Sequence, residues 1–481
     1  MIKRKYEAIQ WTDDADYRIP SELLQWLNRD SYSFLVKGAP GTGKTTLALT
    51  MLRALNPQQN FLFVSTKSSN SEIFRDHGWL SGFLRLTKEE MRDDRRLLYT
   101  HRGSFVDARL DEQSSLFETI TDELMNRRSP LIIIDSWDSI SEMMEPEALL
   151  ANAKVLQTWR ERASAKLILV SSMQETGTFD SVVDGIALLQ QDYLEGRRVR
   201  EIVFSKLHGI ETVHPSYYFT LNGGIFRSFD PYRLSDFAID REVQVRYPMP
   251  DWVERSRLRS ISTMHPELDG VLGGGFPVGS IAIVEIDRNV NSRVVLAVLR
   301  RMLDHLVTRG NLLLFQPPSG TDAEQVGNLL GSFQHGQRKR RVEVLRSNSD
   351  DVKPDADTLS DRATGRSLLE TLSSELRKRF PERTLVALID LGSIHMQHGW
   401  KQDAWAKRLQ EFLRRETDLS IIVARRGEIP DEQNIEAETR LEIVDMRGTL
   451  FLDFKVPYSQ YFSVSSEKRL GRSSIELEPM S

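Results

Sequence analysis

The sequence predicts an α/β protein made of two similar domains in tandem, each a mostly parallel, twisted sheet flanked by helices. Two observations predict this fold class. Short, continuous apolar runs alternate with longer amphipathic segments, a pattern typical of parallel strands that helices cover on both faces. In addition, landmarks of the first half recur about 250 residues later. The chain therefore reads as a duplicated α/β unit.

Length and composition are consistent with this organisation. A chain of 481 residues is long enough for two or three domains with cores of their own. The 64 Lys and Arg residues against 69 Asp and Glu residues give a net charge of −5, so no global positive field attracts nucleic acid. The absence of cysteine excludes disulfides and thiolate metal sites. With no apolar run long enough to span a membrane, we expect a cytoplasmic protein without a membrane partner.

The strands expected in the first half are six apolar runs: 33–38, 61–65, 131–135, 166–172, 185–189 and 200–207. Helical patterns lie between them, including the segment after Lys44 and residues 114–128. Strands and helices that alternate in this way favour a sheet with helices on both faces.

The first of these strands runs into "GAPGTGKTT", which satisfies the phosphate-binding pattern GxxxxGK[ST] between a strand and a helix. Glycines let the backbone curl so that its N–H groups point at phosphates, and the helix N-terminus adds its dipole. We expect Lys44 to reach the β and γ phosphates of ATP and the Thr45 hydroxyl to bind Mg²⁺. The predicted nucleotide-binding residues are Gly38, Ala39, Pro40, Gly41, Thr42, Gly43, Lys44, Thr45 and Thr46.

Asp135 ends the apolar run "LIIID" and is the second predicted metal residue beside Thr45. A carboxylate at this position emerges at the carboxyl edge of a parallel sheet, where it can hold the hydration shell of Mg²⁺. The alternative is that Asp135 caps the helix that follows.

Four stretches of the first half resemble the RecA-like ATPases of the KaiC, RadA and gas-vesicle-repressor group. They are "GAPGTGKTTLAL", "FLFVS", "LIIIDSWDSI" and "VVDGIALLQQDYLEGRRVREIVFSKLHG", and the resemblance covers residues 20–230. It implies two tandem RecA-like P-loop domains, the second degenerate, and a nucleotide held between neighbouring subunits of a homo-oligomer.

The resemblance also implies residues that act in trans from a neighbouring subunit. In the family, a lysine and an arginine of a K-x-R-G segment touch the neighbour's phosphates. Here Lys206 matches the lysine, and His208 stands where arginine is usual. The alternative for Lys206 is a solvated strand end.

A second departure from the family lies after the second strand. One or two glutamates usually follow this strand and polarise the attacking water, but "FLFVSTKSS" places Lys67 and Ser68 there. A missing general base costs about 10²- to 10⁴-fold in rate. We therefore expect ATP to bind and to be hydrolysed slowly, with Glu72 as the nearest substitute base.

The second half repeats these landmarks with a changed loop. At a spacing of 249 residues, Arg293 aligns with Lys44 in "EIDRNVNSRVV", and Asp287, Val290 and Ser292 align with glycines of the first loop. Bulky residues at glycine positions prevent close approach of the backbone to phosphate. We expect this domain to bind no nucleotide and to serve as a structural or partner-binding module.

The expected domain boundaries follow from these repeats. We place the nucleotide-binding domain at 1–240, a linker at 241–260, the degenerate domain at 261–465 and a disordered tail at 466–481. A basic run, Arg338 to Arg341, is consistent with a nucleic-acid contact, although a solvated loop is the reading that the net charge favours.

Three functions remain open at this point. The favoured one is an ATP-dependent regulatory switch, with slow hydrolysis, nucleotide-dependent assembly or partner binding, and a transcriptional role similar to that of gas-vesicle repressors. The second is a DNA-repair or recombination ATPase, which the overall charge disfavours. The third is a scaffold that binds nucleotide without hydrolysing it.

Overall fold

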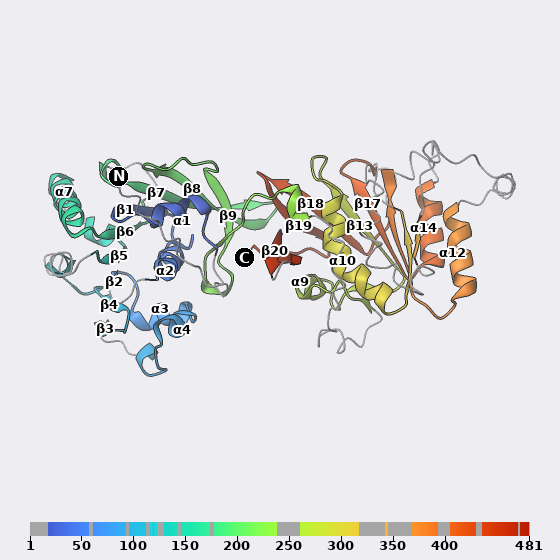
Figure 1. Cartoon of the computed structure of the whole chain (residues 1–481), viewed down its shortest axis with the longest axis horizontal. Coiled ribbons are helices and arrows are strands. Elements are labelled where there is room, and N and C mark those ends of the chain that lie inside the picture. Colours follow the sequence, from blue (N-terminus) through green and yellow to red (C-terminus); the bar gives the residue numbers. More distant parts are fainter. Residues whose placement is uncertain are drawn as a thin grey trace, which may run out of the picture. The chain divides into compact units, whose positions relative to one another are not determined.

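The computed structural model describes most of the chain as two compact units, Met1–Asp230 with Met480–Ser481 and Pro231–Pro479 (Figure 1). The residues described are 18–56, 61–92, 96–111, 129–141, 146–173, 178–237, 260–316, 342–344, 368–392, 405–429, 435–469 and 472–480, with a few positions between 116 and 122. The basic run at 338–341 and nearly all of the expected linker lie outside them.

The first unit contains one sheet in the order β10-β9-β8-β7-β1-β6-β5-β2-β4-β3. Its strands from β7 to β4 run parallel, and antiparallel strands extend the sheet at both margins. The strands are β1 (Tyr32–Gly38), β2 (Phe61–Ser65), β3 (Leu97–Tyr99), β4 (Gly103–Asp107), β5 (Leu131–Asp135), β6 (Lys166–Ser171), β7 (Gly185–Leu194), β8 (Arg197–Leu207), β9 (Ser216–Thr220) and β10 (Arg227–Ser228).

Helices cover both faces of this sheet because its strands are apolar on both sides. In β2, Phe61 and Phe63 pack with one cluster of buried residues, and Leu62 and Val64 pack with the other. The first cluster includes residues of α1 (Ser21–Leu27), α2 (Lys44–Leu55), α3 (Asn70–Asp76) and α4 (Leu80–Leu84), and the second includes residues of α6 (Asp138–Ser141) and α7 (Pro146–Ala163).

The second unit repeats this topology in the order β15-β14-β16-β17-β13-β18-β19-β20-β21. Its parallel strands are β13 (Ser280–Ile286), β14 (Leu312–Phe315), β15 (Val342–Val344), β16 (Leu385–Asp390), β17 (Leu419–Arg425) and β18 (Thr439–Met446). Antiparallel strands follow, namely β19 (Thr449–Val456), β20 (Phe462–Arg469) and β21 (Arg472–Pro479), and a small separate sheet pairs β11 (Ser260–Ile261) with β12 (Phe276–Pro277). The predicted α/β class with two sheet domains is confirmed.

Strand by strand, β7, β1, β6, β5, β2 and β4 correspond in order and direction to β18, β13, β17, β16, β14 and β15. The strands from β7 to β4 and from β18 to β15 run parallel, as the mostly parallel sheets of the prediction require. Antiparallel strands extend the first sheet at both margins and, among the described residues, the second sheet beyond β18. The end of β1 and the end of β13 are therefore equivalent places in the two units.

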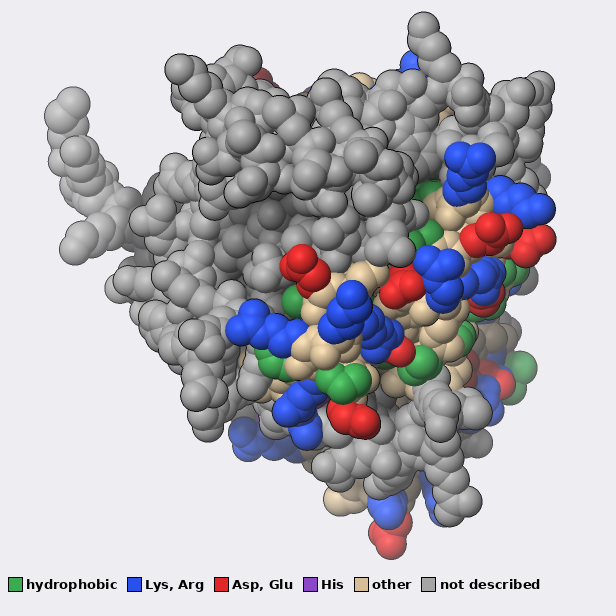
Figure 2. Space-filling view, turned by 90° about the vertical axis from the view of Figure 1, so that its right-hand side faces the viewer, with side chains coloured by type: hydrophobic (Ala, Val, Ile, Leu, Met, Phe, Trp, Pro, Cys, Tyr) green, Lys and Arg blue, Asp and Glu red, His purple; other side chains and the backbone are tan. Residues whose placement is uncertain are grey.

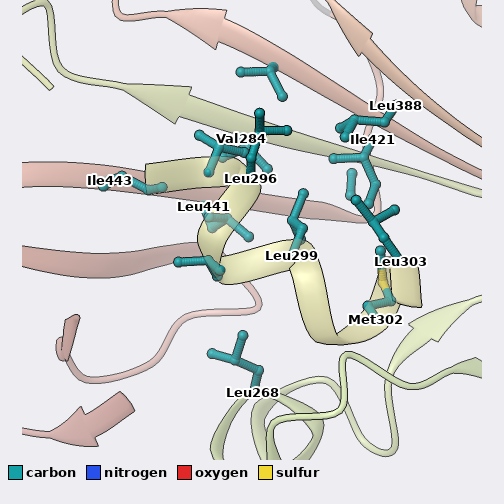
Figure 3. Packing of buried hydrophobic residues seen from close by; sticks show 14 of the residues in the cluster. Leu268, Val284, Leu296, Leu299, Met302, Leu303, Leu388, Ile421, Leu441 and Ile443 are labelled. Carbon is teal, nitrogen blue, oxygen red and sulfur yellow. The ribbon is translucent and has the colours of Figure 1, made fainter. Parts of the chain in front are cut away.

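Two layers of helices also cover the second sheet. Leu296, Leu299 and Leu303 of α10 (Arg293–Thr308) pack against Val284 of β13 and Leu441 of β18, as Figure 3 shows. The opposite face packs with α12 (Leu368–Arg379) and α14 (Trp405–Glu416), and the short α9 (Pro266–Val271) adds Leu268 to the α10 side.

Two of the expected boundaries are wrong. The segment 466–481 is not a disordered tail, because it completes β20 and forms β21, and its Ile475 and Leu477 join the buried cluster around α10. Their alternation with polar residues is the period of a half-buried strand. Residues 231–237 belong to the second unit rather than the first, since the Tyr232 N–H donates to Gly448 O at 2.8 Å and Phe237 is buried in the same cluster.

Candidate functional site

The loop 39–43 follows β1 at the carboxyl edge of the first sheet, and α2 begins at Lys44. Two of its glycines are required by the backbone. Gly43 has φ +95°, and a Cβ atom there would lie 2.5 Å from the Leu221 side chain. Gly41 has φ +81°, and a Cβ atom there would meet nothing within 4 Å. The loop is thus closed toward the protein at Gly43 and open on the side of Gly41.

Lys44 folds back over this loop. Its Nζ donates to Gly38 O at 2.7 Å and to Ala39 O at 2.8 Å, and the residue is 8% exposed. Burial and the positive charge of Lys67 lower the pKa of Lys44, against the opposing effect of the Asp135 and Asp138 carboxylates. The ammonium thus satisfies two loop carbonyls, while the partial positive charge at the start of the helix beside it favours an anion.

Thr45 and Asp135 are brought together as the sequence predicts. The Thr45 hydroxyl donates to Asp135 Oδ2 at 2.6 Å, although the two residues come from α2 and β5. Burial raises the pKa of Asp135, and the hydrogen bond from Thr45 offsets this only in part. A cation beside this carboxylate would favour its ionised form. The pair therefore fits Mg²⁺, which takes one or two protein oxygens together with phosphate and water.

This pair is not a complete metal cage. Among the residues that the structure describes, no group of three or more His, Cys, Asp or Glu side chains could hold a metal ion. A magnesium ion at Thr45 and Asp135 would consequently depend on oxygens of a bound nucleotide.

Asp138 is a site residue that the sequence reasoning missed. Its Oδ1 accepts from the Ser171 hydroxyl at 2.6 Å, and its Oδ2 accepts from the Ser172 N–H at 2.6 Å. Although burial opposes ionisation, these hydrogen bonds hold the pKa of Asp138 below its ordinary value. The signal was present in "DSWD", where a second carboxylate follows Asp135 by three residues.

Lys67 lies beside this second carboxylate, at the place expected for a water-polarising glutamate. Its Nζ is 3.5 Å from Asp138 Oδ2 and donates to the Ser172 hydroxyl at 3.1 Å, while 49% of its side chain is exposed. Glu72 does not replace the missing base here, because its Oε2 accepts from the Ser69 N–H at 3.0 Å in the capping box of α3. The end of β2 thus presents a cation to the site.

The buried His77 ring hydrogen-bonds the first turn of α2. Its Nδ1 donates to Ile73 O at 3.0 Å, so its Nε2 accepts from the Thr46 hydroxyl at 3.1 Å. Burial lowers the pKa of His77, which keeps the ring neutral and the acceptor available at neutral pH. This contact fixes the orientation of Thr46, one of the predicted nucleotide-binding residues.

Lys206 and His208 lie at the end of β8 and just after it. Lys206 Nζ donates to Val183 O at 2.5 Å within its own chain, and the backbone carbonyl of His208 accepts from Arg29. The His208 side chain is exposed. Their role toward a neighbouring subunit stays a prediction.

The equivalent loop of the second unit is filled by its own side chains. Val290, at the position of Gly41, is 1% exposed and belongs to the core cluster around α10. From the end of β17, Arg425 Nη1 donates to Val290 O at 2.6 Å, and its Nη2 donates to the Ser292 hydroxyl at 3.1 Å. A guanidinium thus satisfies the loop internally, at a place where the first unit has Ser171.

On one end of the second unit, the described basic and acidic side chains are mixed. Figure 2 shows Lys and Arg side chains interspersed with Asp and Glu on the end of the protein that carries α12 and α14. Several are paired, among them Arg377 with Asp418 at 2.8 Å and Arg414 with Glu438 at 2.7 Å. Mixed charge of this kind is typical of a solvated helix pair. In the described part of the chain, no helix is long and apolar enough to cross a membrane.

Comparison with known proteins relates the first unit to one family. Residues 25–205 match the family described as GvpD gas vesicle protein, P-loop domain. The chain is 25% identical over 299 residues to Protein GvpD2 of Halobacterium salinarum, covering 59% of this chain and 59% of that protein. It is 26% identical over 300 residues to Protein GvpD1 of the same organism, covering 59% of this chain and 54% of that protein.

The chain thus spans little more than half the length of the relatives that it matches. The family match includes β1, the loop 39–43, α2 and β5, which together carry Lys44, Thr45 and Asp135. The first unit therefore contains a P-loop domain similar to that of the GvpD gas vesicle proteins.

Proposed function

We propose that the first unit binds ATP with Mg²⁺ and that the chain works as a nucleotide-dependent regulatory switch. The observation that carries this proposal is the open loop at Gly41, with the Lys44 ammonium and the Thr45–Asp135 pair on either side of it. A P-loop uses such a set to hold the phosphates through backbone N–H groups and one lysine, and the metal through a hydroxyl.

Binding would exchange contacts that the protein already makes. The Lys44 ammonium would leave the carbonyls of Gly38 and Ala39 for the phosphates, and the Thr45 hydroxyl would turn its oxygen toward Mg²⁺. Asp135, whose pKa burial raises, would become ionised beside the cation. The Lys44 exchange is favourable because an ammonium binds an anionic phosphate oxygen more strongly than a neutral carbonyl oxygen.

Hydrolysis in this proposal is slow. Lys67 stands where a carboxylate would orient water, and Glu72 is engaged in a helix cap. A lysine beside the γ phosphate adds charge stabilisation to the bound nucleotide but accepts no proton from water. ATP would then act as a long-lived ligand that stabilises one state of the protein.

The state that ATP stabilises would be an assembly. In this proposal Lys206 and His208 contact the nucleotide of a neighbouring subunit, as the family resemblance suggests. Similarity to the GvpD gas vesicle proteins supports a transcriptional or gas-vesicle-type regulator as our favoured role, and we propose that it acts in the cytoplasm with a protein partner. A DNA-repair ATPase has less support because the charged surface of α12 and α14 is mixed in sign. A scaffold without hydrolysis stays the nearest alternative.

The test uses the purified full chain, with binding of ATP-Mg²⁺, turnover, and mass in solution measured together. The switch predicts tight binding, slow turnover and a larger mass with ATP than without it. Turnover that rises strongly when DNA is added would favour the repair ATPase instead. Rapid hydrolysis by a monomer would contradict both the switch and the shared site.

A further inference from the structure

A solvent-open cavity of about 700 Å³ lies on the surface of the second unit, at the carboxyl edge of its sheet. Three loops line it: residues 287–289 after β13, residues 426–427 after β17, and residues 445–448 at the turn between β18 and β19. This edge is where open α/β sheets bind ligands. The volume is also in the range of small-molecule sites, about 300–1,000 Å³.

Each of the three loops contributes one arginine to the cavity wall, namely Arg288, Arg426 and Arg447. The carboxylates in the wall are Asp287 and Asp445. The ionised side chains of the lining therefore carry an excess of positive charge. Guanidinium groups present planar pairs of N–H donors, which match the oxygens of phosphate groups.

The two carboxylates are already engaged in holding the loops together. Asp287 Oδ1 is 3.3 Å from Arg426 Nη1, and Asp287 Oδ2 accepts from the Asp445 N–H at 3.2 Å. Asp445 Oδ1 accepts from the Gly448 N–H at 2.7 Å. The Asp287 side chain thus ties its loop to the other two, the Asp445 side chain closes its own turn, and the wall is organised without a ligand.

Two further features shape the wall. The Arg425 guanidinium binds carbonyls of the loop that follows β13 and fixes its path. Gly427 has φ +84°, a backbone conformation that favours glycine, and a Cβ atom there would be only in ordinary contact with Arg288 Nη2, at 3.7 Å.

We propose that this cavity binds a small molecule that carries a phosphate group, through side-chain guanidinium groups rather than through the backbone of a P-loop. The chemistry applies equally to a phosphate monoester and to a diphosphate. In this reading the second unit lost the glycine loop but kept the ligand-binding edge of its sheet. The proposal is independent of ATP binding by the first unit.

The test measures binding of inorganic pyrophosphate by calorimetry to the full chain carrying Lys44→Ala, so that the first unit contributes nothing. We expect saturable binding of one pyrophosphate per chain. Arg288→Ala should weaken it by about tenfold or more, since a charge-assisted contact is removed, and Arg288→Lys should weaken it less. The exposed Arg408→Ala on α14 is the matched control and should leave the affinity unchanged.

A second arm replaces pyrophosphate with glucose 6-phosphate, a phosphate monoester that is not a nucleotide. Arg288-dependent binding of glucose 6-phosphate would assign the cavity to monoesters, and binding of pyrophosphate alone would assign it to diphosphates. Thermal unfolding of each variant checks that the second unit remains folded. The proposal is overturned if neither probe binds, or if Arg408→Ala weakens binding as much as Arg288→Ala does.

Discussion

The loops that follow β1 and β13 end equivalent strands of two sheets with the same strand order, yet they are stabilised in opposite ways. In the first, Gly41 leaves space beside the backbone. The Lys44 ammonium there binds loop carbonyls that it could exchange for the oxygens of a phosphate. In the second, Val290 is part of the core and Arg425 holds the carbonyls from a neighbouring strand.

The difference teaches how a ligand-binding loop becomes structural. Loss of the glycines alone would leave a strained loop with unsatisfied carbonyls, which is costly when they are buried. The second unit compensates with an apolar anchor and an internal cation. Its loop gains stability from contacts that a nucleotide would have to break, whereas the first loop keeps its contacts exchangeable.

The largest expected effect comes from removing the exchangeable cation. Lys44→Ala should weaken binding of ATP-Mg²⁺ by about 100-fold or more, because a charge-assisted phosphate contact is lost at the centre of the site. Arg293→Ala, at the aligned position of the second loop, is the control and should leave the affinity unchanged. Equal losses of ATP-Mg²⁺ affinity in the two variants would contradict the view that only the first loop binds nucleotide.

Arg425, the cation that holds the second loop, should contribute to the stability of the protein and not to nucleotide binding. Arg425→Met removes donors to Val290 O and Ser292 Oγ, and we expect it to lower the free energy of unfolding by about 3 kcal/mol. Arg408→Met on the exposed side of α14 is the control. Urea unfolding without nucleotide measures both, and an Arg425→Met protein as stable as the control would refute the internal-cation account.

The rate of ATP hydrolysis tests the role of Lys67 at the first loop. Lys67→Glu should raise hydrolysis roughly 10- to 100-fold without tightening binding, since a carboxylate can orient water. Lys67→Gln removes the charge without supplying a base and should raise it less. Lys206→Ala should cancel the gain if a neighbouring subunit completes the site, so a gain that persists in the double variant argues for a site within one chain.

The smallest expected effect concerns the apolar anchor. Val290→Ala should destabilise the protein by about 2 kcal/mol, through lost burial and a small cavity. Gly41→Ala should weaken nucleotide binding, and its φ of +81° should cost about 1 kcal/mol of stability as backbone strain, although the added Cβ meets nothing within 4 Å. Thermal unfolding and ATP titration of both variants check that Val290→Ala mainly affects stability and Gly41→Ala mainly affects nucleotide binding.

Much of the first site could be predicted because its signals are local in the sequence. The loop, Lys44 and Thr45 follow one motif, and Asp135 follows from its place at the end of an apolar strand. The contacts of Asp138 and Arg425 could not be predicted, since each joins residues far apart in the chain. The tail was not predictable as a strand from composition, because residues 466–481 are mostly polar and only the alternation at Ile475 and Leu477 indicates a half-buried strand.

The fold class was predictable for a similar reason, as apolar runs mark strands wherever they occur. The antiparallel margins were not, because strand direction depends on connections rather than on composition. The boundary at Asp230 also depends on packing, since the segment from Tyr232 to Phe237 has no signal of its own and belongs with the second unit.

The central claim, that the nucleotide binds at the first loop and not at the second, is tested most directly by calorimetric titration of the full chain with ATP-Mg²⁺ in the micromolar range. The account predicts one nucleotide per chain, and none when Lys44→Ala is titrated under the same conditions. Two nucleotides per chain, or undiminished binding by Lys44→Ala, would contradict it.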